Sequence, residues 1–508
     1  MRKQLLCGMA LVALLVPSAA RAAGSGITAI TIAGQQPLGS FNGVAYARVW
    51  GDVAGVVAPG EKVEGLAALP KNAAGDYPYR SAFEIIAPVR HGQSATVLVE
   101  VENRGNPLMP GDLDHFHVAG VPAKAAYPQG LGNGFLQDAG IAYARVAWQT
   151  GISPGVPKSA QGVGEVILRD FARLLGGDRE NLAKGAADFG TYRFRMLGGI
   201  SQSAWFVNTF IAEGFNADPT SGKPVFQGAI AIDGTGNWLA LNRLAAAAHA
   251  TQAPYFAPNA RPLSAAQLLH RPASDPFYID VANYTDFYRV HASLTDTAAL
   301  PATMRRYDWP SPHHPVTTAA DARATFAPGR PGGPCNDGVA VPVNPTSYNP
   351  FLRTLVVELA HQLGAPEAAQ APSLPPSTLF RLGPAPASTA HFNPLPGAAL
   401  EVPLTGAEAQ PLGGVRFPEV VAPLGRPSPV SLPPVITSAI TGVCGNIGEW
   451  QPLTKAALIH RYAGAAGFLN DYAQAIDRLV AGGYLLAGQK QPMLIQAGAQ
   501  YAAAMGGK

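Results

Sequence analysis

The sequence predicts an α/β fold with a mainly parallel central sheet, and three observations support this prediction. Short runs rich in Val, Ile and aromatic residues alternate with helical periodicity through the middle of the chain, an order typical of parallel strands joined by right-handed crossovers. At residues 197–204 a strand pattern turns into a helix pattern through a serine. Apolar residues make up 47% of the 508-residue chain, so its 56 Gly and 47 Pro indicate many loops rather than disorder.

The first 22 residues have the pattern of a cleavable secretory signal peptide. Arg2 and Lys3 precede an apolar run at residues 5–16, and the segment ends in the small-x-small sequence ARA at residues 20–22. The run is too short to span a bilayer, and no later stretch approaches about 18 consecutive apolar residues. We therefore expect a periplasmic or secreted protein without a membrane span.

The charge balance weighs against polyanionic partners. The chain has 36 basic and 33 acidic residues, a formal net charge of +3. Residues 1–22 hold three basic residues and no acid, so 33 of each sign remain beyond them and cancel. A neutral chain without Lys- or Arg-rich runs has no electrostatic footprint for nucleic acid or an anionic membrane. We expect a small-molecule substrate, and the sequence leaves the oligomeric state open.

The elements follow one another in three parts. Residues 27–118 are short β-type runs separated by Gly and Pro, which predicts an N-terminal antiparallel portion. The last of these runs is expected at 95–102. The alternating core follows, with strands expected at 141–148, 191–196, 225–232, 275–281 and 303–309 and helices at 164–175 and 204–214. Beyond about residue 330 the chain is Pro-dense, with helices expected at 352–363 and within 453–504.

These parts predict how the chain is organised. We expect a signal peptide at 1–22, a core at 23–330 and a proline-rich and helical extension at 331–508 that packs on the core. An Ala-rich insertion around 239–275 lies between two core strands and is expected to form a cap over the site.

Ser201 has the sequence context of a nucleophile on a sharp strand-to-helix turn. Such a turn strains the backbone of its central residue and brings neighbouring backbone close, so the residues two before and two after must be small. Gly199 and Ser203 meet this requirement, whereas Ser203 as nucleophile would have the bulky Trp205 at its flank. The alternative interpretation is an ordinary turn marked by Gly and Ser.

A serine hydroxyl needs an imidazole to accept its proton and a carboxylate to orient that imidazole. In α/β-hydrolases these residues follow in the chain order Ser, acid, His. Asp286 follows the expected strand at 275–281, and His314 follows the one at 303–309. Asp233, at an earlier strand end, is the alternative acid, and His313 is the alternative base.

An oxyanion hole is expected beside the serine. One donor would be the backbone N–H of Gln202, directly after the nucleophile, and the other an N–H in the loop after an early strand. The expected strand at 95–102 leads into Asn103-Arg104-Gly105, so the Arg104 to Gly105 turn is the candidate. An ordinary turn explains this stretch equally well.

Several motifs resemble those of a known family. The segment GGISQSAWFVNTFIAEGFNAD resembles the G-x-S-Q-S-G-R-F-x-R-x-F-x-x-x-GFN pattern of a family of mostly uncharacterised bacterial α/β-hydrolase domain proteins. VENRGNP resembles that family's N-R-G-N segment, GNGFLQDAGIAYARVAWQ its G-x-x-F-L-x-x-x-G-Y…W-Q segment, and the C-terminal sequence its closing helices. The resemblance covers most of the chain after residue 22.

The resemblance implies an α/β-hydrolase fold with Ser201 as nucleophile and His314 as base, at the place of the family's A-G-x-x-H histidine. The chain also departs from the family pattern. Ala204 and Trp205 replace the usual Gly-Arg, and the segment before His314 lacks the family's glycine. Tyr284 occupies the glutamate place of the E-T-[DE] motif, which leaves Asp286 as the acid.

The leading hypothesis is an exported serine hydrolase, a carboxylesterase that cleaves carboxylic esters with Ser201, Asp286 and His314 as its catalytic triad. It would need neither a metal nor an organic cofactor. The alternative is a non-catalytic exported binding or scaffold protein that retains the fold. A metal-dependent hydrolase using His115 and His117 ranks third, because no further histidine follows at ligand spacing.

Two cysteines remain beyond the signal segment. Cys335 and Cys444 both lie in glycine-rich stretches. An exported chain is exposed to an oxidising compartment, so we expect a disulfide between them. Two unrelated thiols are the alternative.

Overall fold

The computed structural model describes residues 24–114, 134–149, 151–152, 155–156, 159–242, 261–295, 297–312, 344–386, 397–428 and 449–506. Several predicted features lie outside these residues: the signal peptide, residues 243–260 of the cap, His115, His117, His313, His314, Cys335 and Cys444. Within the described residues, no helix combines the length and apolarity needed to cross a membrane.

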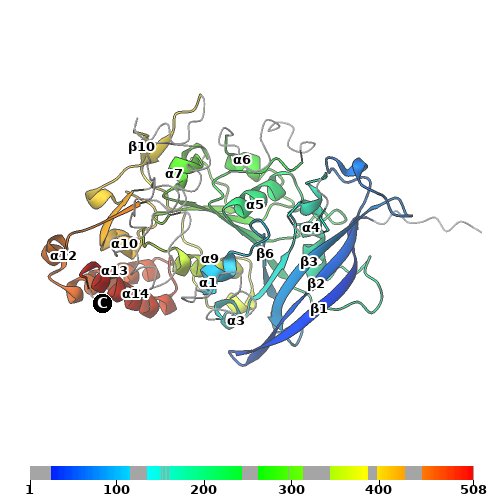
Figure 1. Cartoon of the computed structure of the whole chain (residues 1–508), viewed down its shortest axis with the longest axis horizontal. Helices are drawn as coiled ribbons and strands as arrows, with labels where there is room; N and C mark the ends of the chain where they lie inside the picture. The colour runs from blue at the N-terminus through cyan, green and yellow to red at the C-terminus, as the bar shows by residue number, and fades with distance from the viewer. Residues whose placement is uncertain are drawn as a thin grey trace, which may run out of the picture.

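A nine-stranded sheet runs through the described part of the chain in the order β1-β2-β3-β5-β4-β6-β7-β8-β9 (Figure 1). Its strands are β1 (Gly26–Phe41), β2 (Val44–Val57), β3 (Tyr77–Pro88), β4 (Thr96–Glu100), β5 (Ala142–Val146), β6 (Phe194–Ile200), β7 (Gly228–Ile232), β8 (Phe277–Asn283) and β9 (Met304–Trp309). β1 pairs antiparallel with β2, β2 with β3, and β3 with β5. All further pairs in this order, from β5 through β4 to β9, are parallel. The predicted mainly parallel sheet with an N-terminal antiparallel portion is confirmed.

The antiparallel portion is shorter than the β-type stretch at 27–118. β4 is the last strand of that stretch, and it lies between β5 and β6 and runs parallel to both. All five of its residues are buried. A strand covered on both faces is a continuous apolar run, which is the usual form of a central parallel strand.

The sheet lies between two apolar layers because side chains alternate between its faces. Val97 and Val99 of β4 face a core with α4 (Val163–Leu175) and α5 (Gln202–Ala212). Leu98 faces a second core with α9 (Asn349–Gln362). β4 therefore packs against one helical layer on each side.

The C-terminal helices belong to the second core. α12 (Lys455–Tyr462), α13 (Ala465–Ala481) and α14 (Lys490–Ala504) contribute Leu458, Ile476 and Ala497 to the cluster that holds Leu98 and α9. In Figure 1 they gather at one end of the molecule, opposite the long β1–β3 ribbon. The helices predicted at 352–363 and within 453–504 are present, whereas the domain boundaries stay a prediction.

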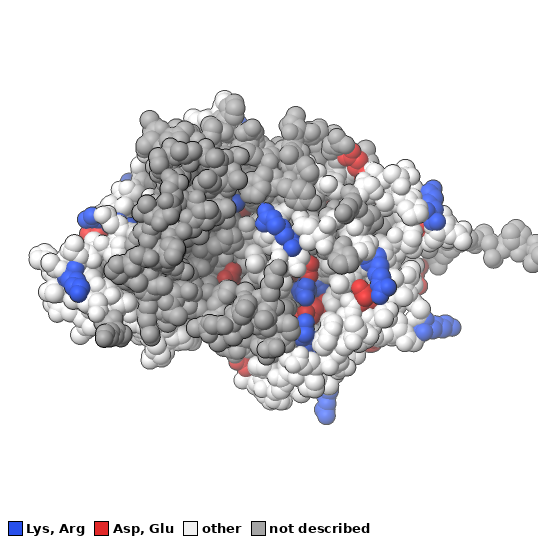
Figure 2. All heavy atoms as spheres, in the orientation of Figure 1, with Lys and Arg blue, Asp and Glu red and all other residues white. Residues whose placement is uncertain are grey.

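Charged residues make up 14% of the chain. On the face shown in Figure 2, Lys and Arg are scattered among uncharged residues and often lie beside Asp or Glu. The described part of this face therefore shows no continuous basic patch.

Candidate active site

The described site residues follow four parallel strands at the same edge of the sheet. The carboxyl ends of parallel strands meet at one edge, where α/β folds place their ligand sites. Arg104 and Gly105 follow β4, Ser201 follows β6, Asp233 follows β7 and Asp286 follows β8. The order along the chain matches the predicted one.

Ser201 lies between the last residue of β6 and the first of α5, with φ 61° and ψ −127°. A positive φ is uncommon for a residue with a side chain and marks a strained turn. The backbone N–H of Ser201 donates to the carbonyl of Ile232, at the end of β7, at 3.0 Å. This bond fixes the turn against the neighbouring strand, and Ser201 is 5% exposed.

The two flanking positions explain why this turn can form. A Cβ placed on Gly199 would lie 2.6 Å from the carbonyl carbon and oxygen of Ser203, so no larger residue fits. The hydroxyl of Ser203 donates to the carbonyl of Ile200 at 2.8 Å and accepts its N–H at 2.9 Å. Ser203 therefore closes the turn, while its neighbour Ser201 has no such local role.

The loop after β4 is a tight turn joined to the serine turn. Asn103 and Asn106 exchange two backbone hydrogen bonds, and Arg104 and Gly105 between them have φ 51° and 76°. The side-chain amide of Asn103 donates to the carbonyl of Ile200, directly before Ser201, at 3.1 Å. The predicted oxyanion turn and the serine thus come together.

Glu100, the last residue of β4, holds the far end of this loop. Its Oε1 accepts the backbone N–H of Leu108 and of Met109, the latter at 2.9 Å, and its Oε2 accepts the hydroxyl of Tyr143. Burial raises the pKa of this carboxyl to about 7, although the hydrogen bonds act in the opposite direction.

Asp233 and Asp286 lie at the ends of neighbouring strands and are both buried. Asp233 has φ 63°, and its carbonyl accepts the indole N–H of Trp205 from α5 at 3.0 Å. Both carboxylates act electrostatically on Arg289 in α7 (Asp286–Arg289). Burial lowers the pKa of the Arg289 guanidinium, and the two carboxylates oppose that shift. Both acids named from the sequence are thus near one buried cation.

Tyr284 supplies no carboxylate at its position before Asp286. Its ring packs against Tyr288 and Phe380 with centroids 6.0 Å apart in each case.

Gln202 is also buried, and its side-chain amide has no hydrogen-bond partner among the described residues. Gln202 directly follows Ser201 in the chain and is the first residue of α5.

The structure thus brings together the serine turn, the loop after β4 and both candidate acids. The two candidate bases lie outside the described residues, as do the histidines of the metal hypothesis. Where the chain is described, no three His, Cys, Asp or Glu side chains are arranged to hold a metal ion. Sequence reasoning missed Asn103 and Glu100, whose only signal was a polar residue at or just after a strand end.

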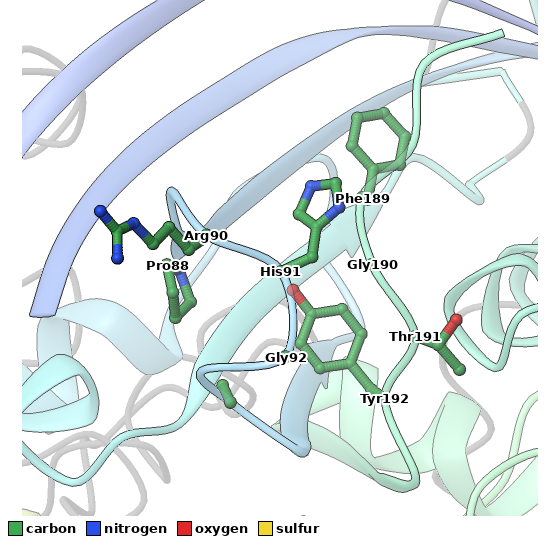
Figure 3. Close-up of a pocket in the computed structure, with 9 residues that line it drawn as sticks. Pro88, Arg90, His91, Gly92, Phe189, Gly190, Thr191 and Tyr192 are labelled. Atoms are coloured by element: carbon green, nitrogen blue, oxygen red, sulfur yellow. The ribbon is translucent and has the colours of Figure 1, made fainter. Parts of the chain in front are cut away.

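The described pockets hold none of these residues. Figure 3 shows one with room for about 10 Å³, lined by residues that include His91 and Tyr192. It lies before the first residues of β4 and β6, at the sheet edge opposite Ser201. Two larger hollows, of about 260 and 390 Å³, are lined by other residues outside the candidate site.

Comparison with known proteins agrees with this architecture. The family model for the alpha/beta hydrolase domain matches residues 119–494. No curated protein matches the chain. Among solved structures, similarity extends to a glucuronoyl esterase from Teredinibacter turnerae, with 14% identity over 57% of this chain and 75% of that one and a TM-score of 0.28.

Two further structures show the same level of similarity. An acetyl xylan esterase from Paenibacillus has 13% identity over 58% of this chain and 86% of that one, with a TM-score of 0.27. Esterase B from Lactobacillus rhamnosis has 10% identity over 45% and 68%, with a TM-score of 0.24.

Proposed function

We propose, from the premise that this chain belongs to the alpha/beta hydrolase domain family, that it is an exported serine hydrolase that cleaves carboxylic esters. The observation that carries the proposal is the conformation of Ser201, held at φ 61° between β6 and α5. Maintaining such strain costs of order 1–3 kcal/mol and is found mostly at functional sites. The export part of the proposal depends on the signal pattern at residues 1–22.

In the proposed reaction, Ser201 Oγ attacks the ester carbonyl carbon while His314 takes the hydroxyl proton. The alkoxide leaves with that proton as an alcohol, and an acyl-serine ester remains. Water, activated by the same base, then releases the carboxylic acid and restores the serine. His313 is the alternative base, and neither step needs a metal or an organic cofactor.

Two backbone donors are proposed to hold the oxyanion. They are the N–H of Gln202 and an N–H of the Arg104 to Gly105 turn, which the Asn103 to Ile200 bond keeps beside the serine. Each such donor stabilises the transition state by about 3 kcal/mol.

Asp286 is the proposed orienting acid, with Asp233 as the alternative. Asp286 comes from the strand before β9, in the chain order of the fold. Its buried carboxylate accepts the backbone N–H of Asn283 at 2.8 Å. If the assignment is right, Asp286→Asn lowers kcat on a short-chain aryl ester far more than Asp233→Asn does.

Labelling with a fluorophosphonate tests the nucleophile. The probe forms a covalent bond with an activated serine, so we expect the wild-type chain to be labelled and Ser201→Ala to lose both labelling and esterase activity. Ser203→Ala is the matched control. The Ser203 hydroxyl is bonded to Ile200 rather than reacting with the probe, so we expect this variant to be labelled. Retention of activity in Ser201→Ala, or a label on another residue, would refute the proposal.

The second candidate is a non-catalytic binding protein with the same fold. The observation that favours it is Tyr284, packed among aromatic rings where the family's glutamate would stand. A folded wild-type chain that resists the probe would support this candidate.

A further inference from the structure

Asn283, the last residue of β8, joins both candidate acids to the loop after β9. Its backbone N–H donates to Asp286 Oδ2 at 2.8 Å, and its side-chain Nδ2 donates to Asp233 Oδ1. Its Oδ1 accepts the hydroxyl of Ser311. All four residues are 0% exposed. One side chain therefore links the ends of three neighbouring strands.

The chemistry of these contacts requires an amide. The amide nitrogen faces a carboxylate and the amide oxygen faces a hydroxyl, so each group meets the partner it can bond. An aspartate here would place two buried carboxylates against each other, and an alanine would leave polar groups unpaired at a cost of about 1–3 kcal/mol each. Asn283 is the residue type that satisfies both sides.

The bond to Ser311 acts on the segment that leads to the candidate bases. Ser311 is held twice, because its carbonyl also accepts the backbone N–H of Tyr284 at 3.0 Å. In sequence, it comes two residues before His313 and three before His314. Fixing Ser311 fixes the point from which that segment departs.

We propose that Asn283 is a positioning residue of the hydrolase, keeping Asp286, Asp233 and the chain after β9 in one hydrogen-bonded unit. The inference rests on the proposed function. A change of the Asn283 side chain releases Asp233 and Ser311 directly, and it reaches Asp286 only through the end of β8 that these bonds hold in place. Misplacement by about 1 Å at such a site costs up to about 100-fold in rate.

Asn283→Ala removes the side-chain bonds and leaves the backbone bond to Asp286. We expect kcat on a short-chain aryl ester to fall roughly 10- to 100-fold with little change in KM. The acid limb of the kcat/KM profile moves to lower pH, because releasing Ser311 lets the base shift away from its carboxylate, and a base without a nearby carboxylate has a lower pKa. Ser311→Ala breaks only one of these bonds, so we expect a smaller loss of kcat. The double variant should lose no more kcat than Asn283→Ala alone, because both changes break the same bond.

Asn216→Ala is the matched control. Asn216 is equally buried and makes three hydrogen bonds, to Phe226 and Ser274, but it lies beyond α5, at the opposite sheet edge. We expect a lower melting temperature with kcat and the pH profile unchanged. If Asn283→Ala does not fold, Ser311→Ala carries the test through the same pH profile.

The outcomes separate this inference from the proposed function. If folded Asn283→Ala had the wild-type kcat and pH profile, the positioning role alone would be overturned. Where Asn283→Ala does not fold, the same result in Ser311→Ala would overturn it. An equal loss in Asn216→Ala would overturn it as well. If the wild-type chain showed no turnover dependent on Ser201, the proposed function would fall and the role of Asn283 with it.

Discussion

At the scale of single residues, two adjacent glycines in β6 have different reasons to be small. A Cβ on Gly199 would lie 2.6 Å from backbone atoms of Ser203 and 2.8 Å from the backbone nitrogen of Ala204. A Cβ on Gly198 would instead meet the thioether end of Met109, a flexible group that can move aside. The first contact is with helix backbone that cannot yield without moving the turn.

We therefore expect Gly199→Ala to be much more damaging than Gly198→Ala. Overpacking against backbone costs about 1–3 kcal/mol of stability, and a displaced Ser201 lowers kcat at least roughly tenfold. Chemical denaturation and ester turnover of both variants provide the measurement. Equal losses in the two variants would show that the close approach at Gly199 has no special role.

The sequence predicted those site residues whose place follows from the order of strands along the chain. Ser201, Asp233 and Asp286 each follow a strand pattern, and each lies at the expected sheet edge. Asn103 and Asn283 act through partners 97 and 50 residues away in the chain. No local pattern specifies such a contact, so these two residues become visible only in the folded molecule.

At the scale of elements, strands were easier to predict than their limits. The strand expected at 191–196 is β6, which spans Phe194–Ile200. Gly198 and Gly199 are poor strand formers, so the apolar pattern ended before them. They lie within the strand because it pairs with β4 and β7 on its two sides. Tertiary contact thus overrides local propensity directly before the nucleophile.

The connection between β4 and α1 (Met109–Asp114) offers a second prediction. Glu100 Oε1 accepts the backbone N–H groups of Leu108 and Met109, at the end of this connection nearest α1. Glu100→Ala therefore frees the loop that carries the proposed oxyanion donor. We expect kcat at pH 8 to fall roughly 10- to 100-fold. Glu100→Gln keeps an oxygen at that position and restores most of the activity.

The glutamine variant also tests the charge of Glu100. The pKa of this carboxyl is about 7 in the folded chain, above its ordinary value of 4.5, because of burial. Glu100→Gln therefore removes any inflection near pH 7 that this group adds to the rate profile. A glutamine variant as impaired as the alanine variant would mean that the loop needs the carboxylate charge rather than the bonds.

At the scale of the whole molecule, buried acids lie in both apolar layers. Glu165 of α4 and Glu213 after α5 face each other, and burial together with their mutual repulsion raises the pKa of Glu165 well above its ordinary value. Glu358 of α9 lies on the opposite side of the sheet and is 0% exposed. Sequence could not indicate this burial, because the helices covering α9 come about a hundred residues later in the chain.

Glu358 makes the pH dependence of folding predictable. Neither of its carboxyl oxygens has a hydrogen-bond partner among the described residues, and burial raises its pKa from 4.5 to about 9. Between these two values the folded chain keeps a proton that the unfolded chain releases. Stability therefore falls as pH rises through this window, by up to about 1.4 kcal/mol per pH unit from this group.

Glu358→Met removes the titrating group and fills a similar volume. We expect it to raise the urea midpoint at pH 8, to change it little at pH 4, and to flatten the decline between those values. Glu401→Gln, at an exposed position in β11 (Glu401–Pro403), is the control and should leave the curve unchanged. If the Glu358→Met and wild-type midpoints stayed parallel from pH 4 to 9, the folded chain would not be holding that proton, and α9 would be packed less tightly against the C-terminal helices than the structure has it.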